Sequence, residues 1–211
     1  MRFLGTLMLF ALAPYCMAQN WAVGVDGGYG VYHDVTIKNG GASADAGFGS
    51  RFAAGAVLTE DMYNHVGGEL RYAFRDGDSE LSSNGHKVNM DGFAQAIHYD
   101  FLFYATPRHT RLRPFVAAGA GIKRYDATSH VAQSFGNLGT LTHAHQVEGM
   151  LSVGGGLKVA LSDRWVLRLD FRDYATPLPD KLFAPAMTAN VHGWLHDFVP
   201  TIGVDWTFGA R

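Results

Sequence analysis

Apolar and polar residues alternate along eight segments of the chain. Successive side chains of a β-strand point to opposite faces, so such alternation indicates a strand with one apolar and one polar face. The clearest case is residues 165–172, where Trp165 and Leu167 alternate with charged residues such as Arg168. The eight segments are residues 21–32, 47–59, 66–75, 87–104, 114–125, 146–161, 165–172 and 201–208.

The connections between these segments are alternately long and short. Residues 33–46, 76–86, 126–144 and 177–194 make long, polar connections, and residues 60–64, 106–111 and 162–164 make short ones. In an antiparallel up-and-down arrangement the long connections all lie at one end and the short ones at the other. The pattern therefore predicts an all-β fold, an eight-stranded antiparallel up-and-down transmembrane β-barrel with long loops at one end.

Two orientations of the faces are compatible with the alternation. In a transmembrane barrel the apolar face contacts lipid, whereas in a soluble periplasmic ligand-binding β-barrel it faces inward. The segments approach or exceed the roughly 9 to 11 residues that a tilted strand needs to cross the hydrocarbon layer. Strand length and the asymmetry of the connections favour the transmembrane barrel.

The first eighteen residues have the pattern of a secretory signal peptide. Arg2 supplies a positive start, residues 3–13 form an uncharged apolar run, and Ala18 is a small residue at the expected cleavage site. We therefore expect a signal peptide at residues 1–18 and one barrel domain at residues 19–211. The single cysteine, Cys16, lies in the segment that is removed, so no disulfide is expected.

The charge balance excludes one class of function. The signal segment contains one of the 17 Lys and Arg residues, so 16 remain against 19 Asp and Glu, which gives a formal charge of −3. A strongly basic nucleic-acid-binding protein is excluded, and no nucleic-acid partner is expected. No stretch after the signal segment is long and apolar enough for a transmembrane helix, so membrane crossing has to use strands.

Charged residues on the polar faces predict an ionic lumen. If the apolar faces meet lipid, twelve charged side chains point inward, six basic and six acidic. An unpaired buried charge costs several kcal/mol, on the order of the desolvation penalty of one ion, so a paired network is expected. Side chains can fill the interior of an eight-stranded barrel, so we expect a closed lumen. The twelve residues are Asp26, Arg51, Glu69, Arg71, Asp100, Lys123, Glu148, Lys158, Arg168, Asp170, Arg172 and Asp205.

Aromatic residues gather near the end with the short connections. Trp and Tyr concentrate where a membrane protein meets the lipid–water interface. The sequence therefore predicts an interfacial aromatic belt at this end. Its members are Trp21, Tyr63, Tyr104, Trp165, Trp206 and Phe208.

Three stretches carry a family resemblance. They are residues 113–121 (RPFVAAGAG), residues 164–172 (RWVLRLDFR) and the closing segment, residues 201–208 (TIGVDWTF). With weaker similarity across the rest of the mature chain, the sequence resembles the outer-membrane β-barrel domain family of the OmpA-like, OmpX and opacity-protein type. This sequence continues for three residues past Phe208, where the family commonly ends on the aromatic residue.

The resemblance implies a location and a set of partners. It implies the outer membrane of a Gram-negative cell, with outer-membrane lipids around the barrel and a final strand that pairs with the first. It also implies insertion by the barrel assembly machinery with periplasmic chaperones, which read a C-terminal signal at Gly203, Trp206 and Phe208. The long loops are expected to meet an extracellular ligand.

Candidate chemistry in the loops is sparse. Ser129 and His130 raise the alternative of a lipid A-modifying outer-membrane enzyme, but neighbouring residues of a strand face opposite ways and do not form a nucleophile–base pair. We therefore expect a non-enzymatic structural or surface-interaction protein, with no catalytic, cofactor or metal residues. Imidazoles at one rim are the alternative metal ligands. The histidines in or beside the long loops are His33, His86, His130, His143, His145, His192 and His196.

Overall fold

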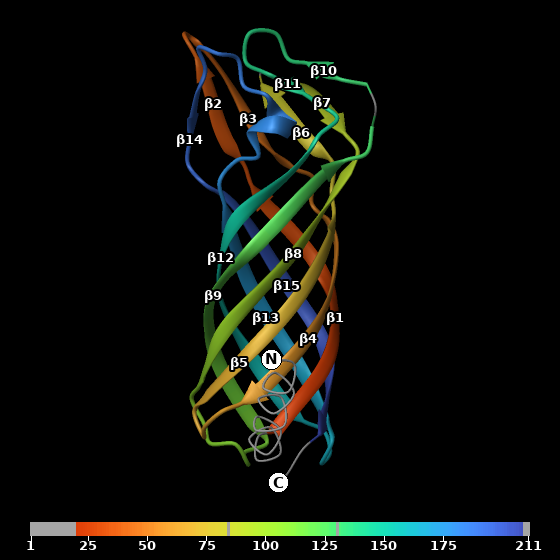
Figure 1. Cartoon of the computed structure of the whole chain (residues 1–211), viewed down its shortest axis with the longest axis vertical. Helices are drawn as coiled ribbons and strands as arrows, with labels where there is room; N and C mark the ends of the chain where they lie inside the picture. Colours follow the sequence, from red (N-terminus) through yellow and green to blue (C-terminus); the bar gives the residue numbers. More distant parts are fainter. Residues whose placement is uncertain (1–19, 84, 130, 209–211) are drawn as a thin grey trace, which may run out of the picture.

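A closed barrel of eight antiparallel strands forms the body of the molecule (Figure 1). The computed structural model describes residues 20–83, 85–129 and 131–208, so the expected signal peptide lies outside the described residues. The barrel strands, in chain order, are β1 (Asn20–His33), β4 (Arg51–Asp61), β5 (Val66–Asp76), β8 (Gly92–Tyr104), β9 (Leu112–Ala127), β12 (His145–Ala160), β13 (Trp165–Thr176) and β15 (Leu195–Phe208). The predicted fold class is confirmed.

The last strand closes the barrel against the first. β15 pairs with β1 on one side and with β13 on the other, with Val25 opposite Val204 and Leu167 opposite Val204 in the two ladders. Around the barrel the order is β1-β15-β13-β12-β9-β8-β5-β4. This arrangement leaves neither edge of the barrel sheet unpaired, as a membrane-spanning sheet requires.

Large apolar side chains cover the outside of the barrel. On β15 Ile202 is 58% exposed, and Val116 of β9 and Val153 of β12 are similarly open. A water-soluble barrel turns such residues toward its core, so the inverted orientation is wrong for this chain. Among the described residues no helix is long and apolar enough to cross a membrane.

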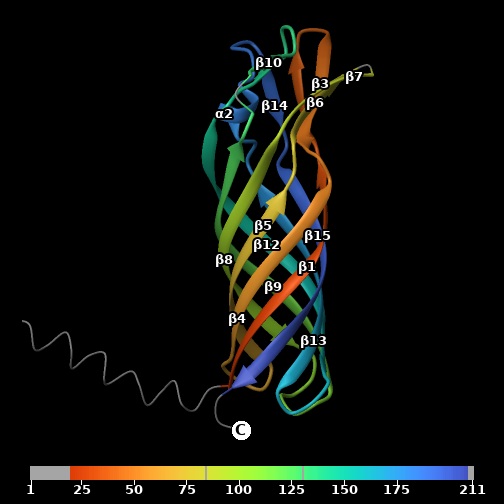
Figure 2. The same cartoon turned by 90° about the vertical axis from the view of Figure 1, so that its right-hand side faces the viewer.

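The sequence pattern predicted that the long connections are loops, and this prediction is wrong for much of their length. They contain a second sheet of five strands in the order β14-β2-β3-β6-β7, which extends the molecule beyond the barrel (Figure 2). We call this region, residues 34–50, 77–91, 128–144 and 177–194, the crown. Its elements are β2 (Val35–Asn39), β3 (Ala42–Phe48), β6 (Ser79–Ser83), β7 (His86–Met90), β10 (Gln133–Ser134), β11 (Thr140–Leu141), α2 (Asp180–Phe183) and β14 (Asn190–His192).

An apolar cluster joins the crown to the barrel. Phe48 stacks on Tyr125 with ring centroids 4.9 Å apart, and Phe183 packs edge-on against the Phe48 ring, with centroids 5.4 Å apart. Ile37 and Leu81 are fully buried in this cluster. The cluster includes residues from four connections and the upper ends of barrel strands, so buried apolar side chains pack over the loop end of the barrel.

Two strand boundaries differ from the prediction for related reasons. Residues 47–59 were expected to form one strand with Phe48 facing lipid, but the chain leaves β3 at Phe48 and begins β4 at Arg51, and Phe48 is buried. Residues 87–104 likewise divide into β7 and β8 around Asp91. In both cases the alternation continues across the bend, so periodicity alone cannot mark where the crown ends and the barrel begins.

Candidate functional site

Arg168 occupies the centre of an ion-paired cluster in the middle of the barrel. Its guanidinium is fully buried, donates to both oxygens of Asp205 at 2.7–3.2 Å and forms an ion pair with Glu69. Arg168 Nη2 also donates to Thr59 Oγ1 at 3.0 Å. These partners come from β15, β5 and β4, so a single side chain connects opposite walls of the lumen.

Arg71 and Arg172 extend the cluster toward the crown. Arg71 Nη2 donates to Asp170 Oδ2 at 2.6 Å, and Arg172 Nη1 donates to Asp100 Oδ2 at 2.5 Å. Both guanidiniums also donate to Glu69 Oε1, at 3.0 and 3.3 Å. Glu69 therefore contacts three arginines when Arg168 is included, and this multiple pairing offsets the cost of burying each charge.

A third charged layer lies directly beneath the apolar cluster of the crown. Lys123 Nζ and Arg75 Nε both donate to Asp197 Oδ2, at 2.7 and 3.1 Å. The rings of Tyr32 and Tyr125 lie 4.7 and 5.2 Å from Lys123 Nζ, within the range of cation–π attraction. Two cations share one carboxylate here, and aromatic faces supply part of the remaining stabilisation.

At the turn end of the barrel, residues 62–65, 105–111 and 161–164, the polar network becomes sparse. Arg113 Nη1 donates to Asp61 Oδ2 at 2.8 Å, and its guanidinium lies 3.7 Å from the ring centroid of Tyr104. Tyr104 is 3% exposed and points into the lumen, so the prediction that it belongs to the outward aromatic belt is wrong. That inference used the height of Tyr104 along β8 and ignored its face.

The structure places ten of the twelve expected lumen charges inside the barrel. All ten side chains are buried, with five basic and five acidic groups. They are Asp26, Glu69, Arg71, Asp100, Lys123, Lys158, Arg168, Asp170, Arg172 and Asp205.

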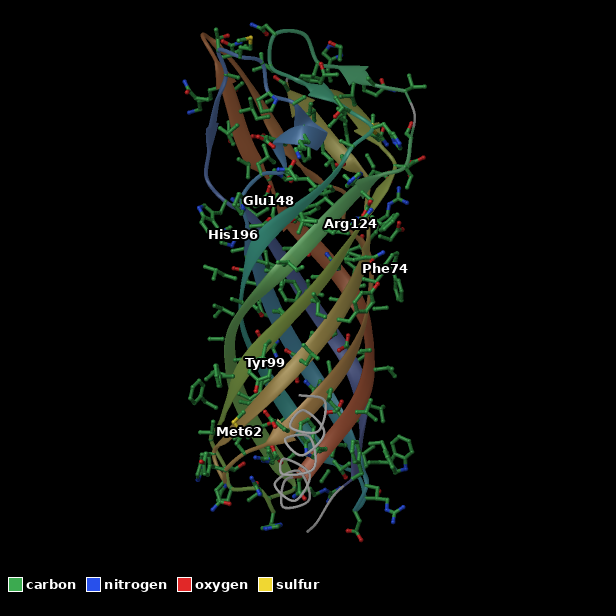
Figure 3. The ribbon with its side chains drawn as sticks, viewed as in Figure 1. Met62, Phe74, Tyr99, Arg124, Glu148 and His196 are labelled. Carbon is green, nitrogen blue, oxygen red and sulfur yellow. The ribbon has the colours of Figure 1, made fainter. Side chains whose placement is uncertain are left out.

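The other two expected charges lie at the loop end, outside the network. Arg51 has the inward parity of β4 but is its first residue, so its half-exposed side chain reaches Asp78 at 2.5 Å and Asp76 at 3.7 Å. Glu148 is partly exposed and accepts a hydrogen bond from Gln146 of its own strand. Figure 3 shows Glu148 close to the crown. The prediction that Arg51 and Glu148 belong to the lumen network is therefore wrong, because their partners lie at the loop end, outside the network.

Four charges of the lumen were missed by the sequence reasoning. Arg75 and Asp197 form the layer under the crown, and Arg113 and Asp61 form the pair at the turn end. Arg75 continues the polar face of its strand and could have been found from parity, whereas Asp197 lies between the predicted last loop, which ended at residue 194, and the predicted last strand, which began at residue 201. With these residues the described lumen holds seven basic and seven acidic side chains, so it is formally neutral.

Gly30 leaves the space that Arg75 occupies. A Cβ atom at Gly30 would lie 1.4 Å from Arg75 Nη2, within the charged layer that Arg75 forms with Asp197 and Lys123. We expect Gly30→Ala to displace the guanidinium from Asp197 and to lower the free energy of unfolding by about 1–3 kcal/mol, the usual cost of overpacking. Urea unfolding in detergent micelles measures the change. Gly149→Ala is the control, because no atom lies within 4 Å of a Cβ there; equal effects of both substitutions would contradict the packing argument.

The histidines do not converge on a metal site in the part of the chain that is described. Residues 20–83, 85–129 and 131–208 contain no group of three His, Cys, Asp or Glu side chains arranged to hold a metal ion. His196 Nδ1 contacts Asp173 Oδ2 at 2.8 Å on the barrel exterior (Figure 3), and His98 Nδ1 contacts Asp100 Oδ1 at 3.1 Å inside the lumen. His130 lies outside the described residues.

The residues of the expected C-terminal signal lie in the closing strand. Gly203 is buried against Asp26 of β1, where a Cβ would lie 2.7 Å from the Asp26 Cβ. Trp206 and Phe208 face outward and stack with centroids 5.3 Å apart at the turn end. Their recognition during insertion stays a prediction.

Comparisons with known proteins agree with this geometry. The model of the family described as "Outer membrane protein beta-barrel domain" matches residues 3–208. The fold is similar to that of the outer membrane protein OprG from Pseudomonas aeruginosa, with 16% identity, a TM-score of 0.55 and coverage of 92% of this chain and 98% of OprG. It is also similar to Neisserial surface protein A, with 12% identity, a TM-score of 0.54 and coverage of 89% and 97%. No curated protein matches the chain.

Proposed function

The chain belongs to the outer membrane protein β-barrel domain family, and we propose that it is a non-enzymatic member with a closed lumen whose crown serves a surface interaction. As a member of this family it lies in the bacterial outer membrane. In such barrels the short turns face the periplasm and the long connections face outside. The crown is then the part that an extracellular ligand meets, and outer-membrane lipids surround the barrel.

The observation that carries the proposal is the obstruction of the lumen at successive levels. The Arg168 cluster spans the middle, the Arg75–Asp197–Lys123 layer lies above it, and the apolar cluster of the crown closes the loop end. Each layer is made of buried side chains that contact one another across the barrel. A continuous water-filled path is not expected through such packing.

The crown supports the surface-interaction part of the proposal. Its five-stranded sheet buries Ile37 and Leu81 on the side of the apolar cluster, and directs polar side chains to the other side. On that polar side Thr36 donates to Asp45 at 3.0 Å, and Lys87 pairs with Glu80 at 2.7 Å. A sheet that is anchored on one face presents a fixed polar surface to the exterior, which suits recognition.

The arrangement of the lumen hydroxyl and imidazole favours a non-enzymatic role. Ser152 Oγ donates to Asp100 Oδ2 at 3.2 Å, while His98 Nδ1 contacts the other oxygen of Asp100. The carboxylate therefore lies between the two groups, whereas a serine nucleophile needs its base within direct hydrogen-bond reach.

Insertion by the barrel assembly machinery and periplasmic chaperones is part of the same proposal, and Gly203, Trp206 and Phe208 are the residues assigned to it.

A liposome-swelling assay tests the closed lumen. We expect proteoliposomes that contain the folded protein to swell in arabinose no faster than empty liposomes, because buried ion pairs fill the barrel. A general porin in the same lipids is the positive control, and the gel shift between unboiled and boiled samples confirms that the barrel is folded. Fast swelling with arabinose would overturn the closed-lumen proposal.

A further inference from the structure

The lumen opens into a cavity of about 1000 Å³ at the turn end. Its walls come from the ends of β1, β4, β9, β12, β13 and β15 and from two of the turns. Met62, which Figure 3 labels, marks this end of the barrel. Asp205 and Thr59 lie on the cavity wall next to the Arg168 cluster, so the cavity is separated from the crown by the layers described above.

Basic side chains outnumber carboxylates around the cavity. Five Lys and Arg residues line it, against three Asp residues. All three carboxylates already have partners: Asp205 accepts from Arg168, Asp61 accepts from Arg113, and Asp163 has an interaction of its own. The five basic residues are Arg108, Arg111, Arg113, Lys158 and Arg164.

Among the residues that the structure describes, Lys158 is a buried cation whose paired carboxylate lies too far away for a hydrogen bond. Its residue is 7% exposed, and its nearest carboxylate oxygen, on Asp205, lies 3.9 Å from Nζ, beyond hydrogen-bond distance. The rings of Tyr104 and Phe115 lie 5.5 and 6.0 Å away and supply only weak cation–π attraction. An ammonium has three donors, and a buried donor without an acceptor costs free energy. Lys158 therefore presents unused donors to the cavity that it lines.

Neighbouring groups add to this donor set. The buried Nε of Arg113 has no hydrogen-bond partner among the described residues. Arg111 and Arg164 are exposed at the cavity rim. The complementary ligand is an anion with several acceptor oxygens, and a phosphate group has this character.

The rim of the cavity is apolar on its membrane side. Trp21, Trp206 and Phe208 line it at the level where the barrel leaves the lipid. We propose that this cavity binds a phosphate group through Lys158, Arg113 and the rim arginines. The phosphate belongs either to a phospholipid headgroup of the inner leaflet or to a soluble phosphate compound. The site does not depend on what the crown binds.

Isothermal titration of the folded protein in a maltoside detergent, which contains no phosphate, tests the site. One arm uses inorganic phosphate and the other uses short-chain phosphatidic acid, both at constant ionic strength. We expect saturable heat in at least one arm, and at least a tenfold weaker affinity for Lys158→Met. Lys38→Met, on the exposed polar side of the crown, is the matched control and is expected to bind like the unchanged protein.

A second variant keeps the test independent of the lumen packing. Arg111→Gln combined with Arg164→Gln changes only exposed rim residues and is expected to weaken binding at least threefold, with an unchanged gel shift. Saturation by phosphatidic acid alone identifies a lipid headgroup, whereas equal saturation by inorganic phosphate identifies a soluble source. The proposal is overturned if neither probe gives saturable heat, or if the rim variant and any folded Lys158→Met protein bind with unchanged affinity.

Discussion

Arg168→Met is expected to lower the free energy of unfolding of the barrel by about 3–5 kcal/mol, the cost of leaving buried charges unpaired. Arg168 is fully buried and pairs with Glu69 and Asp205. Methionine fills part of the volume but donates no hydrogen bond, so Asp205 loses its three contacts with the guanidinium. Lys158, 3.9 Å from Asp205, is too distant to replace them without rearrangement.

Urea unfolding in detergent micelles, followed by tryptophan fluorescence, measures this loss. Arg124→Met is the matched control, because Arg124 is exposed on the barrel exterior and forms an ion pair with Asp126 of its own strand. We expect this control to unfold at nearly the same urea concentration as the unchanged protein, since exposed ion pairs contribute little. Adding Asp205→Asn to Arg168→Met is expected to recover part of the stability, because it removes the carboxylate that loses its guanidinium, whereas Glu69 still pairs with Arg71 and Arg172. A midpoint for Arg168→Met that equals that of the control would refute a stabilising network.

Phe48→Ala is expected to lower the free energy of unfolding of the crown by about 3–5 kcal/mol while the barrel remains folded, because it removes the ring at the centre of the apolar cluster. Phe48 is 5% exposed and contacts the rings of Tyr125, Phe183 and Tyr32. The cavity left behind would separate the crown sheet from the upper end of the barrel. The barrel strands keep their ladders, so the gel shift of the unboiled protein is expected to persist.

Limited trypsin digestion distinguishes loosening of the crown from loss of the whole fold. Lys38, Lys87 and Lys181 are exposed crown residues that trypsin reaches once the backbone around them opens. We expect faster cleavage at these positions in Phe48→Ala than in Met187→Ala, which changes a fully exposed crown side chain. Identical digestion of both variants, with folded barrels in each, would show that Phe48 does not hold the crown in place.

The barrel was predictable because its information is local. Each barrel strand alternates over enough residues to define two faces, as in Trp165–Thr176, and a strand that faces lipid on one side tolerates few exceptions. Parity therefore found Arg168, Arg172 and their neighbours as lumen residues before any partner was known. The same parity assigned Arg51 to the lumen, and this assignment is wrong because Arg51 is the first residue of β4 and its side chain pairs with Asp78 at the loop end.

The crown was not predictable because its sheet is assembled from distant parts of the chain. β2 pairs with β14, so Ile37 lies opposite Val191, and β3 pairs with β6 of the next connection. Strands of three to seven residues carry too little alternation to stand out from loop sequence, and their pairing depends on connections that the barrel brings together. Polar composition was therefore interpreted as irregular structure.

The sequence by itself determined that eight alternating segments close into a barrel with charged residues inside, because strand period and segment length are properties of neighbouring residues. Only the tertiary structure decided which charges meet. Asp197 pairs with Arg75 and Lys123 because β15 begins as early as Leu195. Tyr104 is buried because its side chain lies on the inward face of β8, although its position along the strand matches that of the aromatic belt. Contacts across a lumen join residues up to 122 positions apart in the chain, and their partners are fixed by the register of the closed sheet.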